Sequence, residues 1–371
     1  MKICFWGDIA GALAGNTSGG SELQTALIAK ALAWAGHEIV IVDVNAKEDY
    51  ITPEGIKVFW IPEWNRGIRY FRLFTHRLPG LYRNLKLRKA DIYYCRMRDF
   101  THILSYWAAR KVSGKWVLAM ASDLDALGFK MRLKYYYIPK PGGLWWLFNA
   151  VTVEIIYPIL RRKADMVFVQ HEDQKFFLLE RNIRSITFQN LIDVDKIPDV
   201  QNPERNYFIH VGSLDKRKGF NQFYEIVKRS PSHLFKIVGQ PRDKSALIYY
   251  EKLKSFGNVI LCGRLSHADT VYQIANSKAL ISTSMMEGFP NIFIEAWACG
   301  VPVLSLNFDP GGVIEKEQLG VVANGNVDIL LKAMEETANT DEFASRAKKY
   351  VDANHVLNEE KIQEIDQLFK F

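Results

Sequence analysis

Short, nearly unbroken apolar runs recur along the chain and alternate with longer amphipathic segments. Runs of this kind indicate strands that are buried on both faces, as in parallel sheets, and the segments between them indicate covering helices. The runs fall at residues 3–6, 38–43, 91–96, 115–120 and 164–170 and then at 207–211, 234–239, 259–263, 279–284 and 301–304. The pattern therefore predicts an α/β protein with two doubly wound, Rossmann-like domains.

The two groups of runs are separated by a segment rich in Pro, Asp and Asn, a composition typical of a linker. A chain of 371 residues also exceeds one ordinary hydrophobic core. We therefore expect a first domain over residues 1–195, a linker over 196–206, a second domain over 207–351 and terminal helices over 352–371.

The first domain opens with strand, loop, helix and strand over residues 2–43. The loop ends in Gly19-Gly20-Ser21-Glu22, where Ser21 is a candidate N-cap, and Asp43 ends the second strand as a ribose-binding acid would. A dinucleotide-dependent oxidoreductase opens in a similar way, but this loop lacks the compact G-x-G-x-x-G of that class.

Polar side chains follow two further strands of the first domain. Arg96 ends the strand at 91–96 and Arg98 follows it, and Ser122 and Asp123 follow the strand at 115–120. Because the carboxyl ends of parallel strands border the ligand crevice, these four residues are candidates for the acceptor side of a site. Asp123 is also a candidate for assisting an acceptor hydroxyl, although a strand-end or N-cap acid is an equally good interpretation.

Two segments of the second domain carry candidate donor chemistry. The strand at 207–211 leads into a glycine turn with Arg217 and Lys218 before a helix, which is chemically a seat for a diphosphate. The segment 286–303 reads as loop, short helix and strand, with Glu287 before the helix and Glu295 within it. Helix-start amides favour phosphate and carboxylates accept hydrogen bonds from hydroxyls, so a sugar nucleotide fits both.

One segment of the chain carries most of the excess positive charge. The net charge is +7, and residues 64–90 hold eight basic side chains and no acid, so the rest of the chain is nearly neutral. Bulky apolar residues interleave with these cations, which suits an anionic membrane surface. Nucleic acid would also suit such a segment, and so would solvated helix faces that pack their aromatic residues on the core.

Cys4, Cys95, Cys262 and Cys299 lie without metal-ligand spacing, and the first residues lack a signal-peptide pattern. We expect the reducing cytoplasm, with a peripheral position on the inner face of the membrane. The apolar run 144–160 is too short and interrupted to span a bilayer and is expected to be a buried helix, with an interfacial role for its Trp-rich start as the alternative.

The Glu-x7-Glu inside EGFPNIFIEAWACGVPV closely resembles the signature of the retaining glycosyltransferases of family 4, which have the GT-B fold. The resemblance implies two Rossmann-like domains that face each other across a cleft and a metal-independent hexosyl transfer. It implies a UDP- or GDP-linked sugar as the donor substrate, no cofactor, and a glycan or lipid-linked acceptor in cell-surface polysaccharide or glycolipid synthesis. It does not imply a nucleic-acid partner.

The resemblance assigns roles by motif position. Glu287 contacts the donor sugar, the amides of 289–292 hold the distal phosphate, Glu295 takes the ribose hydroxyls, and Lys218 neutralises the leaving diphosphate. The catalytic candidates are Glu287, Lys218 and Asp123, and no metal ligands are expected. The donor-binding candidates are Gly19, Gly20, Ser213, Arg217, Lys218, Gly239, Gly263, Arg264, Glu287, Gly288, Phe289, Pro290, Asn291, Ile292 and Glu295.

The chain departs from the family pattern at two points. Ser213 stands where the family has an Arg, and no His stands near Ala121-Ser122-Asp123, since His102 lies on the preceding helix. These departures leave open a non-catalytic, membrane-associated nucleotide-sugar or glycan-binding protein with a degenerate site. A phosphorylase or a nucleotide-sugar epimerase on the same fold is a further alternative.

Overall fold

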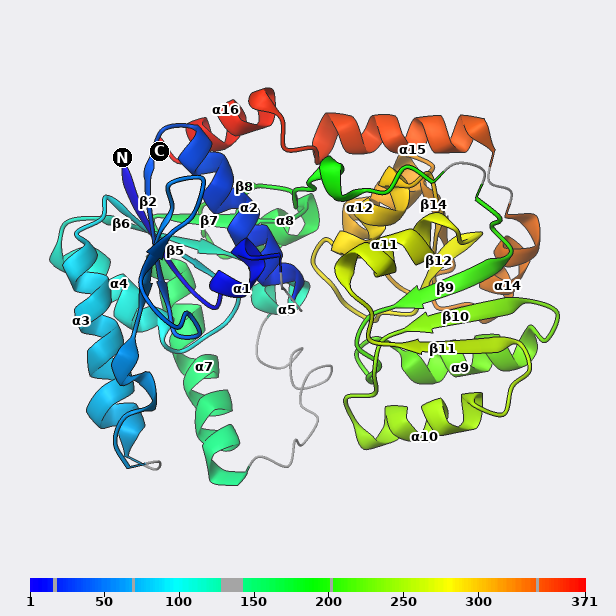
Figure 1. Ribbon diagram of the computed structural model, residues 1–371, viewed down its shortest axis with the longest axis horizontal. Helices are drawn as coiled ribbons and strands as arrows, with labels where there is room; N and C mark the ends of the chain where they lie inside the picture. The colour runs from blue at the N-terminus through cyan, green and yellow to red at the C-terminus, as the bar shows by residue number, and fades with distance from the viewer. Residues whose placement is uncertain (16–18, 69–70, 128–142, 201–202, 338–339) are drawn as a thin grey trace. The chain divides into compact units, whose positions relative to one another are not determined.

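The computed structural model describes residues 1–15, 19–68, 71–127, 143–200, 203–337 and 340–371, with side chains outside 143–150 (Figure 1). The chain forms two compact units, residues 1–191 with 357–371, and residues 192–356. Each unit is an α/β structure on one mostly parallel sheet, as the apolar runs predict. None of the helices in the described ranges combines the length and apolar character that crossing a bilayer requires.

The first unit is built on an eight-stranded sheet in the order β3-β4-β2-β1-β5-β6-β7-β8. All neighbours pair in parallel except β3 and β4. The strands are β1 (Lys2–Trp6), β2 (Glu38–Asp43), β3 (Tyr50–Ile51), β4 (Lys57–Trp60), β5 (Ile92–Arg96), β6 (Lys115–Ala119), β7 (Met166–Val169) and β8 (Ser185–Thr187). The chain order reverses between β1 and β5, which is the switch point where doubly wound sheets bind ligands.

Alternate residues of each strand point to opposite faces, so the first sheet has two cores. Ile3 and Phe5 of β1 pack with the helices of one face, and Cys4 and Trp6 pack with those of the other. The first face carries α1 (Ala10–Leu13), α2 (Gly20–Trp34) and α16 (Glu359–Leu368), and the second carries α3 (Leu78–Arg88), α4 (His102–Lys111) and α7 (Gly143–Lys163). Shorter helices are η1 (Pro62–Asn65), η2 (Leu73–Arg77), α5 (Asp123–Ala126) and α8 (Glu172–Leu179).

The last helix, α16, belongs to the first unit, where it lies against α2 (Figure 1). The Nε2 atom of His37 lies 2.7 Å from Oδ1 of Asp366 on α16. The C-terminal segment is thus bound to the first unit by a polar contact as well as by the apolar residues Ile365 and Phe369.

The second unit has six parallel strands in the order β11-β10-β9-β12-β13-β14, with its switch point between β9 and β12. They are β9 (Tyr207–Val211), β10 (Leu234–Val238), β11 (Val259–Gly263), β12 (Ala279–Ser282), β13 (Val303–Ser305) and β14 (Gly320–Val322). One face packs on α9 (Phe220–Arg229), α10 (Lys244–Leu253) and α14 (Val327–Glu336), and the other on α11 (His267–Ala275), α12 (Asn291–Ala298) and α15 (Asp341–Asn354). Shorter elements are η3 (Val194–Lys196), η4 (Pro310–Gly312) and α13 (Val313–Lys316).

Two local expectations are wrong. The N-cap of α2 is Gly19, in an extended conformation, and Ser21 lies inside the helix. The helix predicted to be buried, α7, buries Tyr157 and Leu160 but exposes Val151, Ile155 and Ile159. Exposed residues four apart lie on one side of a helix, so α7 covers the sheet with one face and presents an apolar stripe on the other.

Asp43 is structural in this protein. Its carboxylate is fully buried at the end of β2 and accepts four backbone hydrogen bonds. Oδ2 accepts from the amides of Ile9 (2.6 Å) and Ala10 (2.8 Å) at the start of α1, and Oδ1 accepts from Asn45 (2.6 Å) and Ala46 (3.1 Å). With both oxygens occupied by the backbone, Asp43 fixes the loops that follow β1 and β2 and is not placed to hold a ribose.

We expect Asp43→Asn to destabilise the first unit. The amide nitrogen of Asn would face two N–H donors and leave them unsatisfied in the interior, which costs about 3 kcal/mol and lowers the melting temperature by roughly 6–12 °C. Thermal unfolding followed by circular dichroism measures the change. Asp8→Asn, at an exposed position of the same loop, is the control and should be nearly neutral.

Candidate active site

The loops after β9 and β12 adjoin each other at the switch point of the second sheet, and Lys218 and Glu287 meet there. The Nζ atom of Lys218 forms an ion pair with Oε1 of Glu287. Two hydrogen bonds join the loops, from Met285 N to Arg217 O (3.0 Å) and from Thr283 Oγ1 to Lys218 O (2.7 Å). Both catalytic candidates of the second domain are therefore held in one place by backbone contacts.

Asp215 organises the turn that carries Lys218. It is buried and accepts hydrogen bonds from Lys218 N (3.0 Å), Arg217 Nη2 (3.1 Å) and Ser213 Oγ (3.2 Å). Burial alone would raise the pKa of Asp215, but the Arg217 guanidinium and the hydrogen bonds outweigh it and hold that pKa below its ordinary value. Ser213, which replaces the Arg of the family motif, thus helps to fix the turn and supplies no positive charge.

Glycine is required where this turn ends. Gly219 has φ +63°, and a Cβ on it would lie 2.1 Å from the carbonyl oxygen of Thr283. Gly239 has φ +148°, and a Cβ there would lie 1.9 Å from the carbonyl oxygen of Gly212. At these two points one backbone segment approaches another so closely that no side chain fits between them. The surface at Gly219 and Gly239 therefore consists of main-chain atoms.

Glu295 lies within α12, which begins at Asn291 after the N-cap residue Pro290. Its side chain is buried, and Oε1 lies 2.9 Å from Nε2 of His267, the first residue of α11. The hydrogen bond with Glu295 raises the pKa of His267, against the opposing effect of burial. His267 is a site residue that the sequence reasoning missed, and only its place after the strand that ends at Gly263 could have indicated it.

The other donor candidates are divided between the two units. Gly288 and Phe289 are buried, and the Phe289 ring packs 5.0 Å from that of His355, so only its backbone could serve a ligand. Gly263 ends β11 with φ +67°, and Arg264 after it is exposed. In the first unit, Gly19 and Gly20 start α2, and the carboxylate of Glu22 folds back over Gly19.

The acceptor-side candidates lie at the carboxyl edge of the first sheet. Arg96 is buried and donates from Nη2 to Oδ1 of Asn190 (2.8 Å), and Arg98 donates from Nη1 to Oε1 of Glu154 (3.0 Å). Ser122 is the N-cap of α5 and forms a capping box with Asp125. Burial raises the pKa of Asp125, opposed by the nearby Arg98. Ser122 is therefore a helix cap rather than an exposed donor.

Asp123 makes contacts that the sequence reasoning did not foresee. Its Oδ1 lies 2.8 Å from Nε2 of His171 and accepts a hydrogen bond from Nε2 of Gln174, also 2.8 Å. His171 lies two residues after the end of β7 and is the N-cap residue of α8. The edge where the sequence offered no histidine thus receives one from the neighbouring strand. His102 lies on α4 as expected, buried, where burial lowers its pKa.

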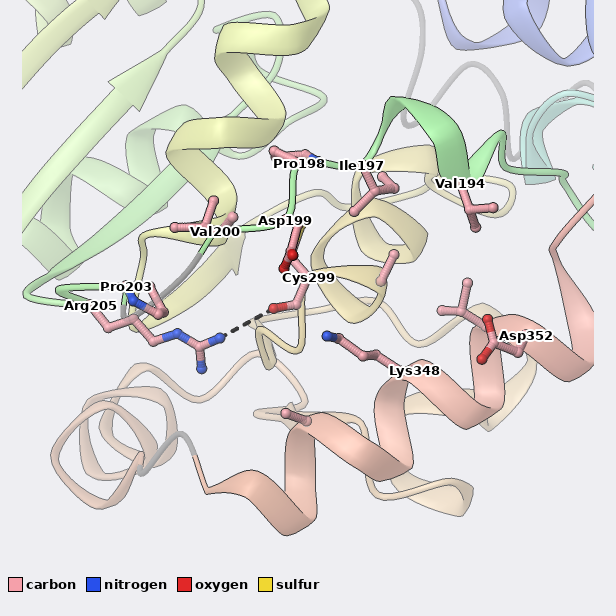
Figure 2. Close-up of a pocket in the computed structure, with 14 residues that line it drawn as sticks. Val194, Ile197, Pro198, Asp199, Val200, Pro203, Arg205, Cys299, Lys348 and Asp352 are labelled. Atoms are coloured by element: carbon pink, nitrogen blue, oxygen red, sulfur yellow. Dashed lines mark hydrogen bonds between the residues drawn. The ribbon is translucent and has the colours of Figure 1, made fainter.

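Figure 2 shows a separate cavity of about 320 Å³ in the second unit, lined by α15, the end of α12 and, from the segment before β9, Val194, Ile197, Pro198, Asp199, Val200, Pro203 and Arg205. Arg205 donates to the carbonyl oxygens of Cys299 (3.2 Å) and Gly300 (3.2 Å), and Lys348 enters from α15. Burial lowers the pKa of Arg205. None of the predicted donor residues lines this cavity, and its arginine is occupied as a cap on the C-terminus of α12.

Within the part of the chain that the structure describes, no group of three or more His, Cys, Asp or Glu side chains could hold a metal ion. Asp123 and Asp125 do not form a pair of metal ligands, since Asp125 is occupied by the backbone amides of Ala121 (2.8 Å) and Ser122 (3.2 Å).

Comparison with known proteins agrees with this arrangement. Residues 193–353 match the family model described as glycosyl transferases group 1. An uncharacterized glycosyltransferase of Haemophilus influenzae is 23% identical, covering 88% of this chain and 89% of that protein. The second unit is thus similar to the group 1 glycosyl transferases, and the similarity to the Haemophilus influenzae protein extends over both units.

The fold is that of solved glycosyltransferase structures. Sucrose-phosphate synthase from Thermosynechococcus elongatus has a TM-score of 0.77 at 16% identity, covering 100% of this chain and 98% of that one. Anabaena Alr3699/HepE, solved in complex with UDP and glucose, has a TM-score of 0.70 at 16% identity, with each chain covered completely. The predicted GT-B fold is confirmed, and the comparisons support a glycosyltransferase of the group 1 type.

The His267–Glu295 contact predicts a pH-dependent contribution to stability. The folded pKa of His267 is raised above the unfolded value of about 6.5, so the stabilisation is complete below that pH and is lost as the pH rises through the folded pKa. We expect the melting temperature of the wild type to exceed that of His267→Gln at pH 5.5 and the difference to shrink by pH 8.5. A difference that is constant over this range would contradict the ion pair.

Proposed function

We propose that this protein is a retaining glycosyltransferase of family 4 that transfers a hexosyl group from a UDP- or GDP-linked sugar to a glycan or lipid-linked acceptor. The reaction would require neither a metal ion nor a cofactor and would serve cell-surface polysaccharide or glycolipid synthesis. The observation that carries the proposal is the meeting of Lys218 and Glu287 at the switch point, with Glu295 close by in α12. The likeness to a protein solved with UDP and glucose supports a nucleotide-sugar donor.

The proposed chemistry follows from charge. Breaking the bond between the anomeric carbon and phosphate places negative charge on the departing diphosphate, which a preorganised cation and oriented N–H groups stabilise. Lys218 supplies the cation, and the amides of Asn291 and Ile292 at the start of α12 supply the dipoles. Glu295 would accept hydrogen bonds from the ribose hydroxyls, and Glu287 from the sugar.

When the donor binds, Lys218 and Glu287 would each replace the other with a group of the ligand. In the structure, Lys218 and Glu287 neutralise each other. A bound nucleotide sugar would offer its diphosphate to Lys218 and its hydroxyls to Glu287, so that neither charge is left without a partner. The attraction between Lys218 and the diphosphate then grows as the diphosphate gains negative charge. Lys218 therefore stabilises the transition state more than the ground state, which is what catalysis requires.

A second candidate function is a non-catalytic membrane-associated protein that binds nucleotide sugars or glycans. One observation favours it: Ser213 hydrogen-bonds to Asp215 where a second cation would otherwise stand, and Arg217 is also directed at Asp215. With fewer cations on the diphosphate, binding could persist while turnover is lost. Measurement of turnover separates the two functions.

The first test is a melting-temperature screen against UDP, GDP, ADP, CMP and their common sugar conjugates, because a ligand that binds the native state stabilises it. We expect a clear rise with one nucleoside diphosphate and its sugar conjugate, and release of that diphosphate on incubation. A rise without release would favour the non-catalytic alternative. No rise at millimolar concentration with any of these ligands would contradict both.

Two variants separate the roles at the donor site. Glu295→Ala should mainly raise the donor KM, since the ribose contact is made before and during the reaction. Lys218→Ala should lower kcat by about 10² or more, since its charge is used most in the transition state. Lys216→Ala, at an exposed position of the same turn, is the matched control and should change neither constant. Equal, small effects of the first two substitutions would refute the assigned roles.

We further propose that residues 64–90 bind an anionic membrane at the cytoplasmic face. None of the cations that the structure describes in this segment forms an ion pair with a described carboxylate. Ile68, Phe71, Phe74 and Leu87 expose their side chains between these cations. The helix interpretation holds for part of the segment, because Leu81 and Leu85 of α3 are buried in the core. Arg69 and Tyr70 lie outside the described residues.

The membrane proposal predicts salt-sensitive sedimentation with vesicles of phosphatidylcholine and phosphatidylglycerol. Lys86→Gln with Lys89→Gln should weaken binding by about 2 kcal/mol, or roughly thirtyfold, since each cation near an anionic surface contributes about 1 kcal/mol. Phe71→Ser should also weaken it, whereas Phe176→Ser is the control, because both phenylalanines are 65% exposed and Phe176 lies on α8. Absence of sedimentation at low salt would rule out the proposal.

A further inference from the structure

The strands β6 and β7 are neighbours in the first sheet and run in parallel, with Val117 opposite Met166 and Ala119 opposite Phe168. The chain turns after each strand at the same edge of the sheet. Asp123 starts α5 after β6, and His171 precedes α8 after β7. Sheet topology alone therefore brings together two polar side chains that are far apart in the sequence.

The contacts around Asp123 fix one of its oxygens and leave the other available. His171 Nε2 and Gln174 Nε2 both lie 2.8 Å from Oδ1. Oδ2 makes no hydrogen bond to any residue within the described ranges. The Asp123 side chain is 22% exposed, whereas the His171 side chain is 4% exposed. Asp123 is therefore partly accessible to solvent, while the histidine that contacts it is buried.

The orientations of both donors are determined. An ionised carboxylate only accepts hydrogen bonds, so His171 must carry its proton on Nε2. The Oε1 atom of Gln174 accepts from Gln170 N at 2.9 Å, so its amide nitrogen must point to Asp123. Gln170 in turn is buried and its side-chain amide hydrogen-bonds with that of Asn190, which ties the group to the chain that leaves the sheet. Neither donor can turn away without losing a second contact or entering the core.

We infer that Asp123 accepts a hydrogen bond from the attacking hydroxyl of the acceptor through Oδ2, and that His171 and Gln174 are positioning residues that hold the carboxylate for this contact. The inference rests on the glycosyl transfer proposed above and adds residues to its acceptor side. A carboxylate with one oxygen anchored and one exposed orients a hydroxyl in a single direction. The lone pair of the acceptor oxygen is then directed at the donor sugar. Because the carboxylate is already held in place, no entropy is lost in ordering it when the substrate binds.

If Asp123 had a purely structural function, its carboxylate would be expected to have hydrogen-bond partners like those of Asp125. Asp125, two residues on, is buried and has its carboxylate occupied by backbone amides and near Arg98. Asp123 differs because its donors are side chains that converge on one oxygen, while its side chain as a whole is 22% exposed. The comparison distinguishes a helix-capping acid from an acid prepared for a ligand in the same turn.

The test uses the full-length protein, the donor identified by the melting-temperature screen, and two acceptor probes, n-octyl β-D-glucopyranoside and water, with release of the nucleoside diphosphate as the readout. His171→Phe keeps the ring shape but removes the donor, and should lower kcat with either probe at least tenfold, with an unchanged donor KM. His171→Gln can place an amide nitrogen near the same point and should restore kcat to within about threefold. Asp123→Asn should resemble His171→Phe.

Asp173→Asn is the control, because Asp173 lies on the other side of the His171 ring, 3.7 Å from Nδ1, and is exposed. It should leave kcat unchanged. Wild-type kinetics in His171→Phe would overturn the inference, and so would equal losses in His171→Phe and His171→Gln accompanied by lower melting temperatures. A wild type that neither binds nor cleaves any donor would overturn the proposed function and the inference together, whereas donor cleavage unaffected by all three substitutions would overturn the inference alone.

Discussion

Unpaired backbone N–H groups at the carboxyl edges of the sheets are the constraint on which the rest of this structure depends. Chain that leaves a parallel strand loses its ladder partners, and buried amides there must find an acceptor. This protein meets the requirement repeatedly with a buried carboxylate. Asp43 accepts from four amides, Asp125 from two after β6, and Asp215 from that of Lys218 after β9.

These anchors explain why the candidate chemistry lies on loops and is nevertheless held firmly. Lys218 and Glu287 are on separate turns, but the turns are joined by main-chain contacts and by the anchored Asp215. Asp123 stands on a turn whose start is capped by Ser122 and Asp125. A site made of loops thereby acquires the rigidity that orientation of a reacting group demands.

Sequence reasoning predicted most of the fold because the buried parallel strands are apolar runs with clear ends. It missed β3, β4, β8 and β14, which are two to four residues long and lie at or next to the sheet edges, where burial does not impose an unbroken apolar pattern. It also took α7 for a buried helix, because a run of apolar residues does not tell whether one face or both are covered.

The candidate site was predicted unevenly, for a physical reason. Lys218, Glu287 and Glu295 sit in local motifs, so their spacing along the chain carries the signal. Their partners come from elsewhere: His267 lies 28 positions before Glu295, and His171 lies 48 positions after Asp123. The first pair arises from the packing of α11 on α12 and the second from the adjacency of β6 and β7, neither of which one sequence specifies. The same limit concealed the structural function of Asp43, whose partners are backbone amides and leave no trace in residue identity.

The ion pair between Lys218 and Glu287 gives each of the two charges a partner at the proposed donor site. A simple anion such as inorganic phosphate would have to displace Glu287 from Lys218 and leave that carboxylate without a partner in a partly buried position. A ligand that presents negative charge and hydroxyl groups at the right separation compensates both members of the pair at once. If the pair is the donor site that we propose, it would therefore favour a ligand whose negative charge and hydroxyl groups are covalently joined over a simple phosphate.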